Sequence, residues 1–240
     1  INLLLSSALL LLTACGAERN LKQAEKHLAL GEYFDAAAQF KQAYSKTPSK
    51  DKATRGIIAA KMALCYERTN ATPKAIAAYQ NAIRYSSVGI DMHLSYARQL
   101  LKNGSYKAAE SEFRLVLDSL PKNQLALDGL VSAQRAKEWK DAGSGYTVKR
   151  MDVFNSHRAD YAPMLTGDGF DRLYFSSTRN EAKGDALSGI TGAKPADIFY
   201  SERDDKGRWS KPEPVSGALN TEFDEGTCAF SPDQRTMYLT

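Results

Sequence analysis

The sequence predicts an α + β protein of two domains, in which an array of helical repeats precedes a domain of short β-strands. Two observations lead to this fold class. Small and aromatic residues recur at a fixed period within residues 21–140, and after residue 145 this pattern gives way to short apolar runs separated by Asp, Gly and Pro. A chain of 240 residues with 43% hydrophobic and 25% charged residues has the size and composition of one or two globular domains.

The first domain, residues 21–140, is predicted from a repeated pattern of glycine, aromatic residues, alanine and proline. One copy of the pattern consists of Gly31, Tyr33, Ala36, Phe40, Ala43 and Pro48, and a later copy of Gly104, Tyr106, Ala109, Phe113, Val116 and Pro121. Alanine lets two helices approach closely, and the aromatic residue one turn later fills the remaining space. The pattern resembles the tetratricopeptide repeat, which has a period of 34 residues and implies paired antiparallel helices.

A middle copy of the repeat lies between these two and departs from them, for example at Thr72, which stands in place of the aromatic residue. Ala75 follows Ala36 by 39 residues, so about five extra residues are expected in a polar loop within residues 49–55. Asn70 stands at the turn in place of glycine, which suits a left-handed backbone. Ser87 stands where the other copies have proline. Three repeats are therefore expected.

A further helix is expected to close the open end of the array, because stacked repeats require a cap. It would span residues 124–140 and use the apolar residues Leu127, Leu130, Val131, Ala133 and Trp139. In repeats of this kind the first helix of each pair lines a groove. The candidates to meet a peptide or protein there are Glu67, Asp91, Arg98 and Lys102, with ordinary solvated charge as the alternative.

The first fifteen residues indicate an export signal. An apolar run over residues 3–12 has the length of a signal peptide and is too short for a permanent membrane span. The run ends in Leu12-Thr13-Ala14-Cys15, which resembles the bacterial lipobox and implies that Cys15 carries lipid. The chain starts at Ile1 without a Met or a basic segment, so the true start is expected upstream. Residues 16–20 would form a polar tether, and the anchor would lie on the periplasmic face of the outer membrane.

The remaining cysteines and the histidines suggest no disulfide framework, metal or cofactor. Cys65 and Cys228 fall one in each domain, and His27, His93 and His157 have no cysteine or carboxylate at metal-ligand spacing. The formal charge of +4 divides unevenly, because residues 16–140 carry 20 Lys and Arg against 12 Asp and Glu. These charges are scattered and not interleaved with stacking aromatics, which argues against nucleic acid as a partner.

The second domain, residues 146–240, is predicted to be the start of a β-propeller. A Gly-Asp-Gly turn at 167–169 leads into Leu-Tyr-Phe-Ser-Ser at 173–177, and Asp-Ile-Phe-Tyr follows at 197–200. A Ser-Pro-Asp turn at 231–233 then leads into Met-Tyr-Leu-Thr at 237–240, which repeats the opening pattern. These signatures resemble the blades of TolB-like propellers. The stretch would supply about one and a half blades, so a longer parent chain is expected.

A lipobox, tetratricopeptide-like repeats and a propeller, in that order, resemble the PorE-like family of type IX secretion lipoproteins. In that family an OmpA-like domain follows and binds peptidoglycan. The resemblance therefore implies a scaffold that anchors envelope or secretion proteins to the cell wall through a C-terminal domain that residues 1–240 do not include.

The sequence does not predict an enzyme. Gly184 and Gly189 have the spacing of a phosphate-binding loop, but Ile190 and Thr191 follow where Lys and Ser or Thr are required. Neither a Gly-x-Ser-x-Gly elbow nor a calcium loop is present. Two alternatives remain open at this stage: a propeller-gated peptidase whose hydrolase domain is missing, and a nutrient-binding lipoprotein.

Overall fold

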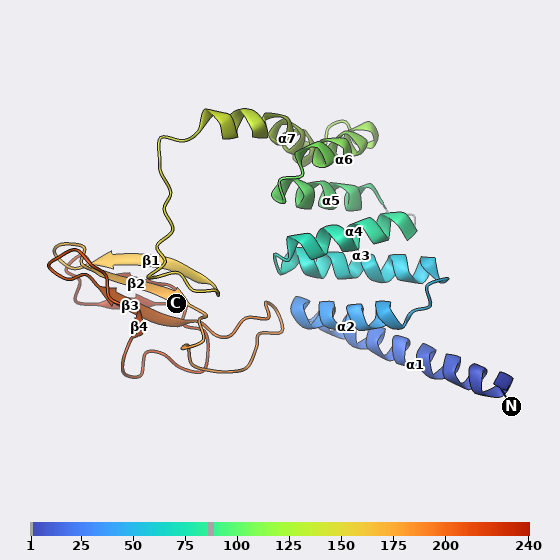
Figure 1. Cartoon of the computed structure of the whole chain (residues 1–240), viewed down its shortest axis with the longest axis horizontal. Helices are drawn as coiled ribbons and strands as arrows, with labels where there is room; N and C mark the ends of the chain where they lie inside the picture. The colour runs from blue at the N-terminus through green and yellow to red at the C-terminus, as the bar shows by residue number, and fades with distance from the viewer. Residues whose placement is uncertain (1, 86–88) are drawn as a thin grey trace. The chain divides into compact units, whose positions relative to one another are not determined.

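The computed structural model of the chain describes residues 2–85 and 89–240, and side chains within residues 16–85 and 89–240. It divides into two compact units (Figure 1). The first comprises residues 1–145 together with 189–191, and the second comprises residues 146–188 and 192–240. The first is helical and the second is built of β-strands.

Helices that pack in the order of the chain form the first unit (Figure 1). They are α1 (Asn2–Ala29), α2 (Tyr33–Lys46), α3 (Lys52–Arg68), α4 (Thr72–Tyr85), α5 (Ile90–Lys102), α6 (Tyr106–Ser119) and α7 (Gln124–Ala142). Each helix contacts the next one along the chain. This arrangement is a tetratricopeptide-like helical array, which confirms the predicted helical part of the fold.

The turn inside each helix pair adopts the same left-handed backbone conformation. The φ angles are 76° at Gly31, 56° at Asn70 and 78° at Gly104. Glycine adopts this region without cost, and asparagine is among the few other residues that tolerate it. The prediction that Asn70 replaces the turn glycine of the middle repeat is therefore confirmed.

The predicted packing residues lie in the core of the helical unit. Ala36, Ala75 and Ala109 are fully buried, one in each repeat. The aromatic residue that follows each alanine by four positions is also buried, and these residues are Phe40, Tyr79 and Phe113. Small residues at the helix crossings thus let the backbones approach, and the rings fill the space beside them.

The extra residues of the first connection are helical, so the expectation of a longer loop is wrong. Helix α3 has 17 residues whereas α5, the equivalent helix of the next repeat, has 13. The additional turn begins at Lys52, where the Asp51 side chain accepts a hydrogen bond from the Thr54 backbone N–H at 3.1 Å. An aspartate in this position satisfies a free N–H group of the first turn and therefore starts the helix early.

The cap helix α7 packs through smaller residues than expected. Its buried residues are Ala126, Gly129 and Ala133, with Leu130 partly buried beside them. The larger residues Leu127, Val131 and Trp139, which also marked this helix in the sequence, are exposed. A β-carbon on Gly129 would lie 2.3 Å from the Phe113 ring, which shows how closely α7 approaches α6.

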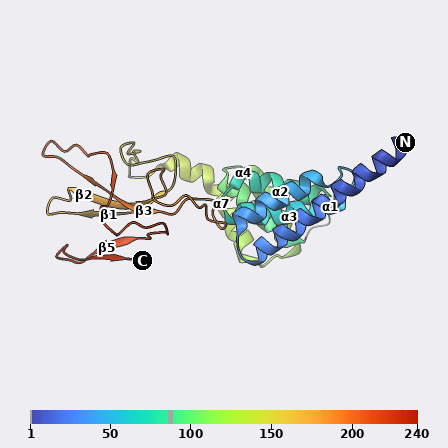
Figure 2. The same ribbon diagram turned by 90° about the horizontal axis from the view of Figure 1, so that it is seen from below.

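Helix α1 includes residues 16–20, which the sequence suggested as a tether, and it extends beyond α2 (Figures 1 and 2). Asn20 is buried and donates a hydrogen bond from Nδ2 to Gln42 Oε1 on α2 at 2.8 Å. Ser87 lies outside the described residues, and Cys15 lies outside the described side chains. Among the described residues no helix is both long and apolar enough to cross a membrane.

The second unit contains two antiparallel sheets. One has four strands in chain order, β1 (Asp160–Thr166), β2 (Arg172–Ser177), β3 (Asp197–Glu202) and β4 (Glu213–Pro214). The other is a hairpin of β5 (Cys228–Phe230) and β6 (Met237–Leu239). The predicted strands are present, but the structure shows one meander and one hairpin and does not establish a propeller.

The hairpin lies beside the four-stranded sheet (Figure 2). The Phe230 ring packs against Tyr174 with 4.9 Å between centroids, and the Ser176 hydroxyl donates to the Gly226 carbonyl at 2.5 Å. Apolar residues of the core include Phe175 and Phe199. Buried polar side chains accompany them, so this unit has a mixed core.

Candidate peptide-binding surface

Helices α3 and α5 present the side chains that the sequence suggested for contact with a partner. Glu67 lies in the last turn of α3, and Arg98 and Lys102 lie in the C-terminal half of α5. Arg98 Nη1 is 4.0 Å from Glu67 Oε1, so the two helix faces that carry these residues are adjacent. We call Ile57, Leu64, Glu67, Asp91, Arg98 and Lys102 together the α3/α5 face.

Glu67 is held by a neighbour on α4 as well as by Arg98. The Tyr79 hydroxyl donates a hydrogen bond to Glu67 Oε2, and Tyr79 itself is buried. Burial, and then the hydrogen bond to the Glu67 carboxylate, raises the pKa of Tyr79, so the phenol stays protonated and remains a donor. The Glu67 carboxylate is thereby fixed in direction, whereas Arg98 is more than half exposed and contacts it only loosely.

Lys102 lies near the same end of the surface. Its Nζ donates a hydrogen bond to Asn70 Oδ1 at 2.7 Å, so α5 is also joined to the turn between α3 and α4. Asn70 therefore has two roles, because its backbone makes the left-handed turn while its side chain orients Lys102. Both Asn70 and Lys102 are exposed, so the ammonium group is accessible to a ligand.

Asp91 lies apart from the other three candidates. It occupies the first turn of α5, seven residues before Arg98. At 1.5 Å of rise per residue, seven residues correspond to about 10 Å along the helix axis. Asp91 shares the α5 face with Arg98, because seven residues are close to two full turns. The structure therefore groups Glu67, Arg98 and Lys102 at one end and leaves Asp91 at the other.

Two apolar residues of this surface were missed by sequence reasoning. Ile57 and Leu64 on α3 have 55% and 38% of their surface exposed. They are seven residues apart and so lie on one helix face, about 10 Å from each other. Helical periodicity could have identified them. Ile57 and Leu64 lie off the helix face that carries the buried residues of α3, such as Ile58 and Met62.

The α3/α5 face thus combines exposed apolar side chains with charges at both ends. A surface of this kind buries apolar side chains of a ligand and orients the ligand through the flanking charges. At the C-terminal end Arg98 and Lys102 outnumber Glu67, so this end favours an acidic group on the ligand. This geometry is suited to recognition of a peptide.

Two of the three histidines pair with a carboxylate that no helical spacing in the sequence indicated. His93 Nδ1 on α5 lies 2.7 Å from Glu112 Oε2 on α6, and His27 Nδ1 lies 2.5 Å from Glu32 Oε2. His157 is exposed in the second unit. The partners lie 19 and five residues away in the chain, which are not helical spacings, and the helix reversals bring them together.

The two described cysteines are free and buried, one in each unit. Burial, and then the nearby Glu25 carboxylate, raises the pKa of the Cys65 thiol to about 11. Burial also raises the pKa of Cys228. Both therefore remain thiols at neutral pH and behave as small apolar residues rather than as nucleophiles.

The sequence matches no known family profile and no curated protein. Solved structures similar to this chain include tetratricopeptide repeat domains. The first such domain of Spaghetti (RPAP3), bound to an HSP90 peptide, has 15% identity and a TM-score of 0.43 and aligns over 52% of this chain and 94% of its own. The C-terminal domain of a Plasmodium falciparum FK506-binding protein has 12% identity, a TM-score of 0.46 and coverages of 55% and 94%. The Sgt2 domain from Aspergillus fumigatus has 17% identity and a TM-score of 0.41, and it aligns over 57% of this chain and 88% of its own.

Proposed function

We propose that the helical unit is a protein-interaction scaffold that binds a peptide segment of a partner on the α3/α5 face. The observation that carries this proposal is the exposure of Ile57 and Leu64 on the helix face that also bears Glu67. Leaving two large aliphatic side chains in water has a cost that burial against a partner recovers. The preferred ligand carries two apolar side chains about 10 Å apart, followed by an acidic group near Arg98 and Lys102.

Peptide display against the complete chain tests this proposal. Peptides selected by the wild type are expected to share apolar residues and an acidic residue at a fixed separation. The variant Arg98→Glu combined with Lys102→Glu is expected to lose the acidic preference, because the attraction becomes repulsion. Replacing Leu64 by Asp is expected to abolish selection altogether.

Arg114→Glu is the matched control, because Arg114 lies on α6 with an exposure close to that of Arg98 and outside the α3/α5 face. It changes the net charge by the same amount per site without changing this surface. Selection of the same peptides by Arg114→Glu and by the double variant would contradict the proposal.

We also propose that the chain is part of a lipid-anchored, non-enzymatic scaffold of the bacterial envelope on the periplasmic face of the outer membrane. The lipobox-like Leu12-Thr13-Ala14-Cys15 supports the anchor, and the order of a helical array followed by β-sheets supports the likeness to type IX secretion lipoproteins. Further partners would then be secretion proteins, and peptidoglycan through an OmpA-like domain of the parent protein. A propeller completed in the parent would enclose the strands of the second unit.

Metabolic labelling with palmitate in a bacterial host tests the anchor. The parent protein is expected to incorporate label and to fractionate with the outer membrane, and Cys15→Ala is expected to lose both properties. Cys65→Ala is the control, since it removes a thiol of the helical core and leaves the lipobox intact. Label in Cys15→Ala would refute the anchor and leave the peptide-binding proposal untouched.

A further inference from the structure

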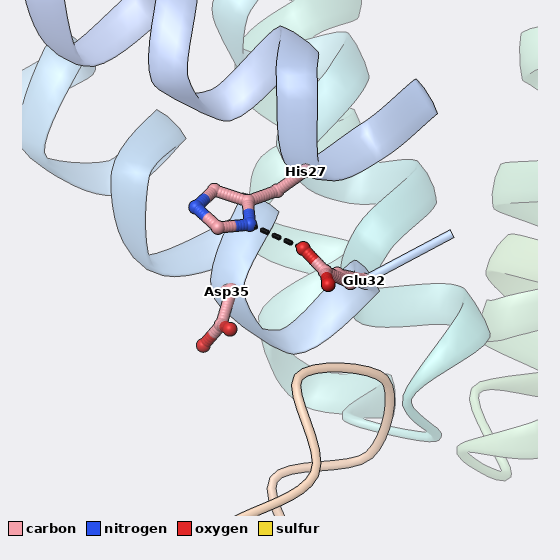
Figure 3. Close-up of side chains that lie close together, drawn as sticks. All are labelled: His27, Glu32 and Asp35. Atoms are coloured by element: carbon pink, nitrogen blue, oxygen red, sulfur yellow. Dashed lines mark hydrogen bonds and ion pairs between the residues drawn. The ribbon is translucent and has the colours of Figure 1, made fainter. Parts of the chain in front are cut away.

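The turn between α1 and α2 gathers three side chains of the kinds that bind metal ions. His27 comes from the last turn of α1, Glu32 from the residue before α2, and Asp35 from the first turn of α2 (Figure 3). One potential ligand atom from each of them lies within 4.8 Å of the others. Within the described side chains this is the one group of three such residues at that spacing.

The backbone holds the cluster together. Gly31 has a φ of 76°, which reverses the chain directly after α1. The Glu32 N–H then donates to the His27 carbonyl at 2.9 Å, so the two residues are fixed side by side. Glu32 occupies the N-cap position of α2, but its side chain makes no capping hydrogen bond. Its carboxylate is turned toward the imidazole instead (Figure 3).

We propose that His27, Glu32 and Asp35 form a binding site for a divalent transition metal ion, with Zn²⁺ as the preferred ion. Imidazole nitrogen and carboxylate oxygen are both zinc ligands, and in sites with three protein ligands water takes the fourth position. Calcium is disfavoured, because it requires six to eight oxygen ligands and does not favour imidazole. The ion would link the end of α1 to the start of α2.

Binding requires a small rearrangement of the side chains. The His27 Nδ1 and Glu32 Oε2 atoms are 2.5 Å apart, within hydrogen-bonding distance, whereas two ligands of one zinc ion lie about 3.3 Å apart, given bonds of about 2.0–2.1 Å in a tetrahedron. An ion between them would therefore separate these two atoms by less than 1 Å. The second ring nitrogen points away from Glu32 and can keep its proton (Figure 3).

A second histidine in the same unit provides an internal control. His93 pairs with Glu112 at 2.7 Å, much as His27 pairs with Glu32. No third candidate ligand joins His93 and Glu112 within the described side chains. Two ligands rarely hold zinc against water, whereas three commonly do, so the two pairs should differ in their response to the metal.

Titration calorimetry with Zn²⁺ on the tag-free chain tests the site. The wild type is expected to bind one ion per chain. His27→Gln and Asp35→Asn are each expected to weaken binding by at least about ten-fold, since even the loss of an outer-shell partner costs roughly 10- to 100-fold. His93→Gln is expected to bind as the wild type does. Circular dichroism of each variant shows whether the helices are retained.

Two further readouts distinguish a built site from adventitious binding. Zn²⁺ is expected to raise the melting temperature of the helical unit in the wild type and in His93→Gln, but not in His27→Gln, because an ion that binds only the folded state stabilises it. Co²⁺ in place of Zn²⁺ is expected to show the visible absorption of a four-coordinate site. Equal binding by all variants, or loss in His93→Gln alone, would overturn the proposal.

Discussion

The cores of the two units of this chain differ in the residue types that they bury. Side chains in the core of the helical unit are mostly alanines and single aromatic rings, whereas its ion pairs, such as Lys61 with Glu25 and Arg114 with Glu110, lie at least partly in water. The sheet unit buries charged and polar groups beside its aromatic rings, including Arg179, Asp197 and Asn220. In the helical unit charge is therefore available for binding, whereas in the sheet unit charge holds the fold together.

The difference follows from how each unit satisfies its backbone. Helices close their hydrogen bonds within themselves, so their side chains need only to pack. Strand edges and loops need outside partners. Asn220 supplies one such partner, since its side chain accepts from the Ile198 N–H at 2.8 Å and donates to the Ile198 carbonyl at 3.0 Å. The Asn220 side chain thus makes the two backbone hydrogen bonds with Ile198 that a neighbouring strand would otherwise make.

The largest expected effect comes from breaking the buried charge pair of the sheet unit. Arg179 Nη2 lies 2.8 Å from Asp160 Oδ1, with both side chains less than 10% exposed, and the guanidinium packs on the Phe175 and Phe199 rings. Asp160→Ala leaves the Arg179 charge buried without its carboxylate, so we expect a loss of about 3–5 kcal/mol in the free energy of unfolding. Near-ultraviolet circular dichroism during urea unfolding measures this loss.

The exposed pair of Arg172 and Glu202 in the same sheet is the control for this prediction. These side chains are each 56% exposed and 3.3 Å apart, so Glu202→Ala should cost no more than about 1 kcal/mol. Burial opposes ionisation of Asp160, but hydrogen bonds from Ser177 and its other neighbours outweigh it and hold the pKa of Asp160 below its usual value. Its contribution is therefore present above the ordinary carboxyl pKa and is lost as the pH falls through the lowered one. Equal losses for both variants would contradict the contrast.

The second prediction concerns close packing in the helical unit. Gly129→Ala places a β-carbon 2.3 Å from the fully buried Phe113 ring, so the ring or helix α7 must shift. Overpacking of this kind costs about 1–3 kcal/mol, against a gain of about 1 kcal/mol in helix propensity. We expect net destabilisation of α7 in thermal unfolding followed at 222 nm. Gly145→Ala, with no atom near the new methyl group, should leave stability unchanged.

The third prediction concerns the buried carboxyl of Asp197. Its Oδ2 accepts from the Lys183 N–H at 3.0 Å, while Oδ1 has no donor within the described residues. Burial, and then the nearby Glu225 carboxylate, raises the pKa of Asp197. Since the folded state favours the protonated acid, the contribution to stability is full below the ordinary carboxyl pKa and declines as the pH rises through the raised value.

Asp197→Asn should remove that decline. The amide keeps an acceptor for the Lys183 N–H and carries an N–H donor that the nearby Glu225 carboxylate can accept. This pairing would relieve a cost of roughly 1–3 kcal/mol for the unsatisfied buried Oδ1 atom. We expect the melting temperature of the sheet unit to rise at pH 7 and to change little at pH 4. A stabilisation that is independent of pH would show that ionisation of Asp197 is not the cause.

The helical fold could be predicted because its information is local and periodic. Ala36, Ala75 and Ala109 recur near one spacing, and each marks a helix crossing whatever the rest of the chain does. The longer α3 could not be predicted in the same way, because a count of extra residues does not show whether they extend a loop or a helix. The capping role of Asp51 decides that question, and capping depends on conformation as well as on residue type.

The candidate sites were less predictable, because they depend on which faces meet. Register alone places Arg98 and Lys102 on one side of α5, and the structure adds that Glu67 and Asn70 meet them. No helical spacing indicated the cluster around His27, because Glu32 and Asp35 follow the turn that reverses the chain after α1. In the sheet unit the pairing of Asn220 with Ile198 could not be predicted either, because the two residues are 22 positions apart and meet only through the fold.

The smallest expected effect is on the Arg98 to Glu67 pair. At 4.0 Å and with Arg98 54% exposed, the pair is loose and screened by water, so Arg98→Ala should change the free energy of unfolding by less than about 0.5 kcal/mol. A double-mutant cycle with Glu67→Gln measures the coupling, and glutamine retains an acceptor for the Tyr79 hydroxyl. Coupling well above 1 kcal/mol would mean that this charge is structural, as Arg179 is in the sheet unit. Weak coupling combined with a loss of peptide selection in Arg98→Ala would show that Arg98 serves recognition, since a charge that stability does not require can be directed toward a partner.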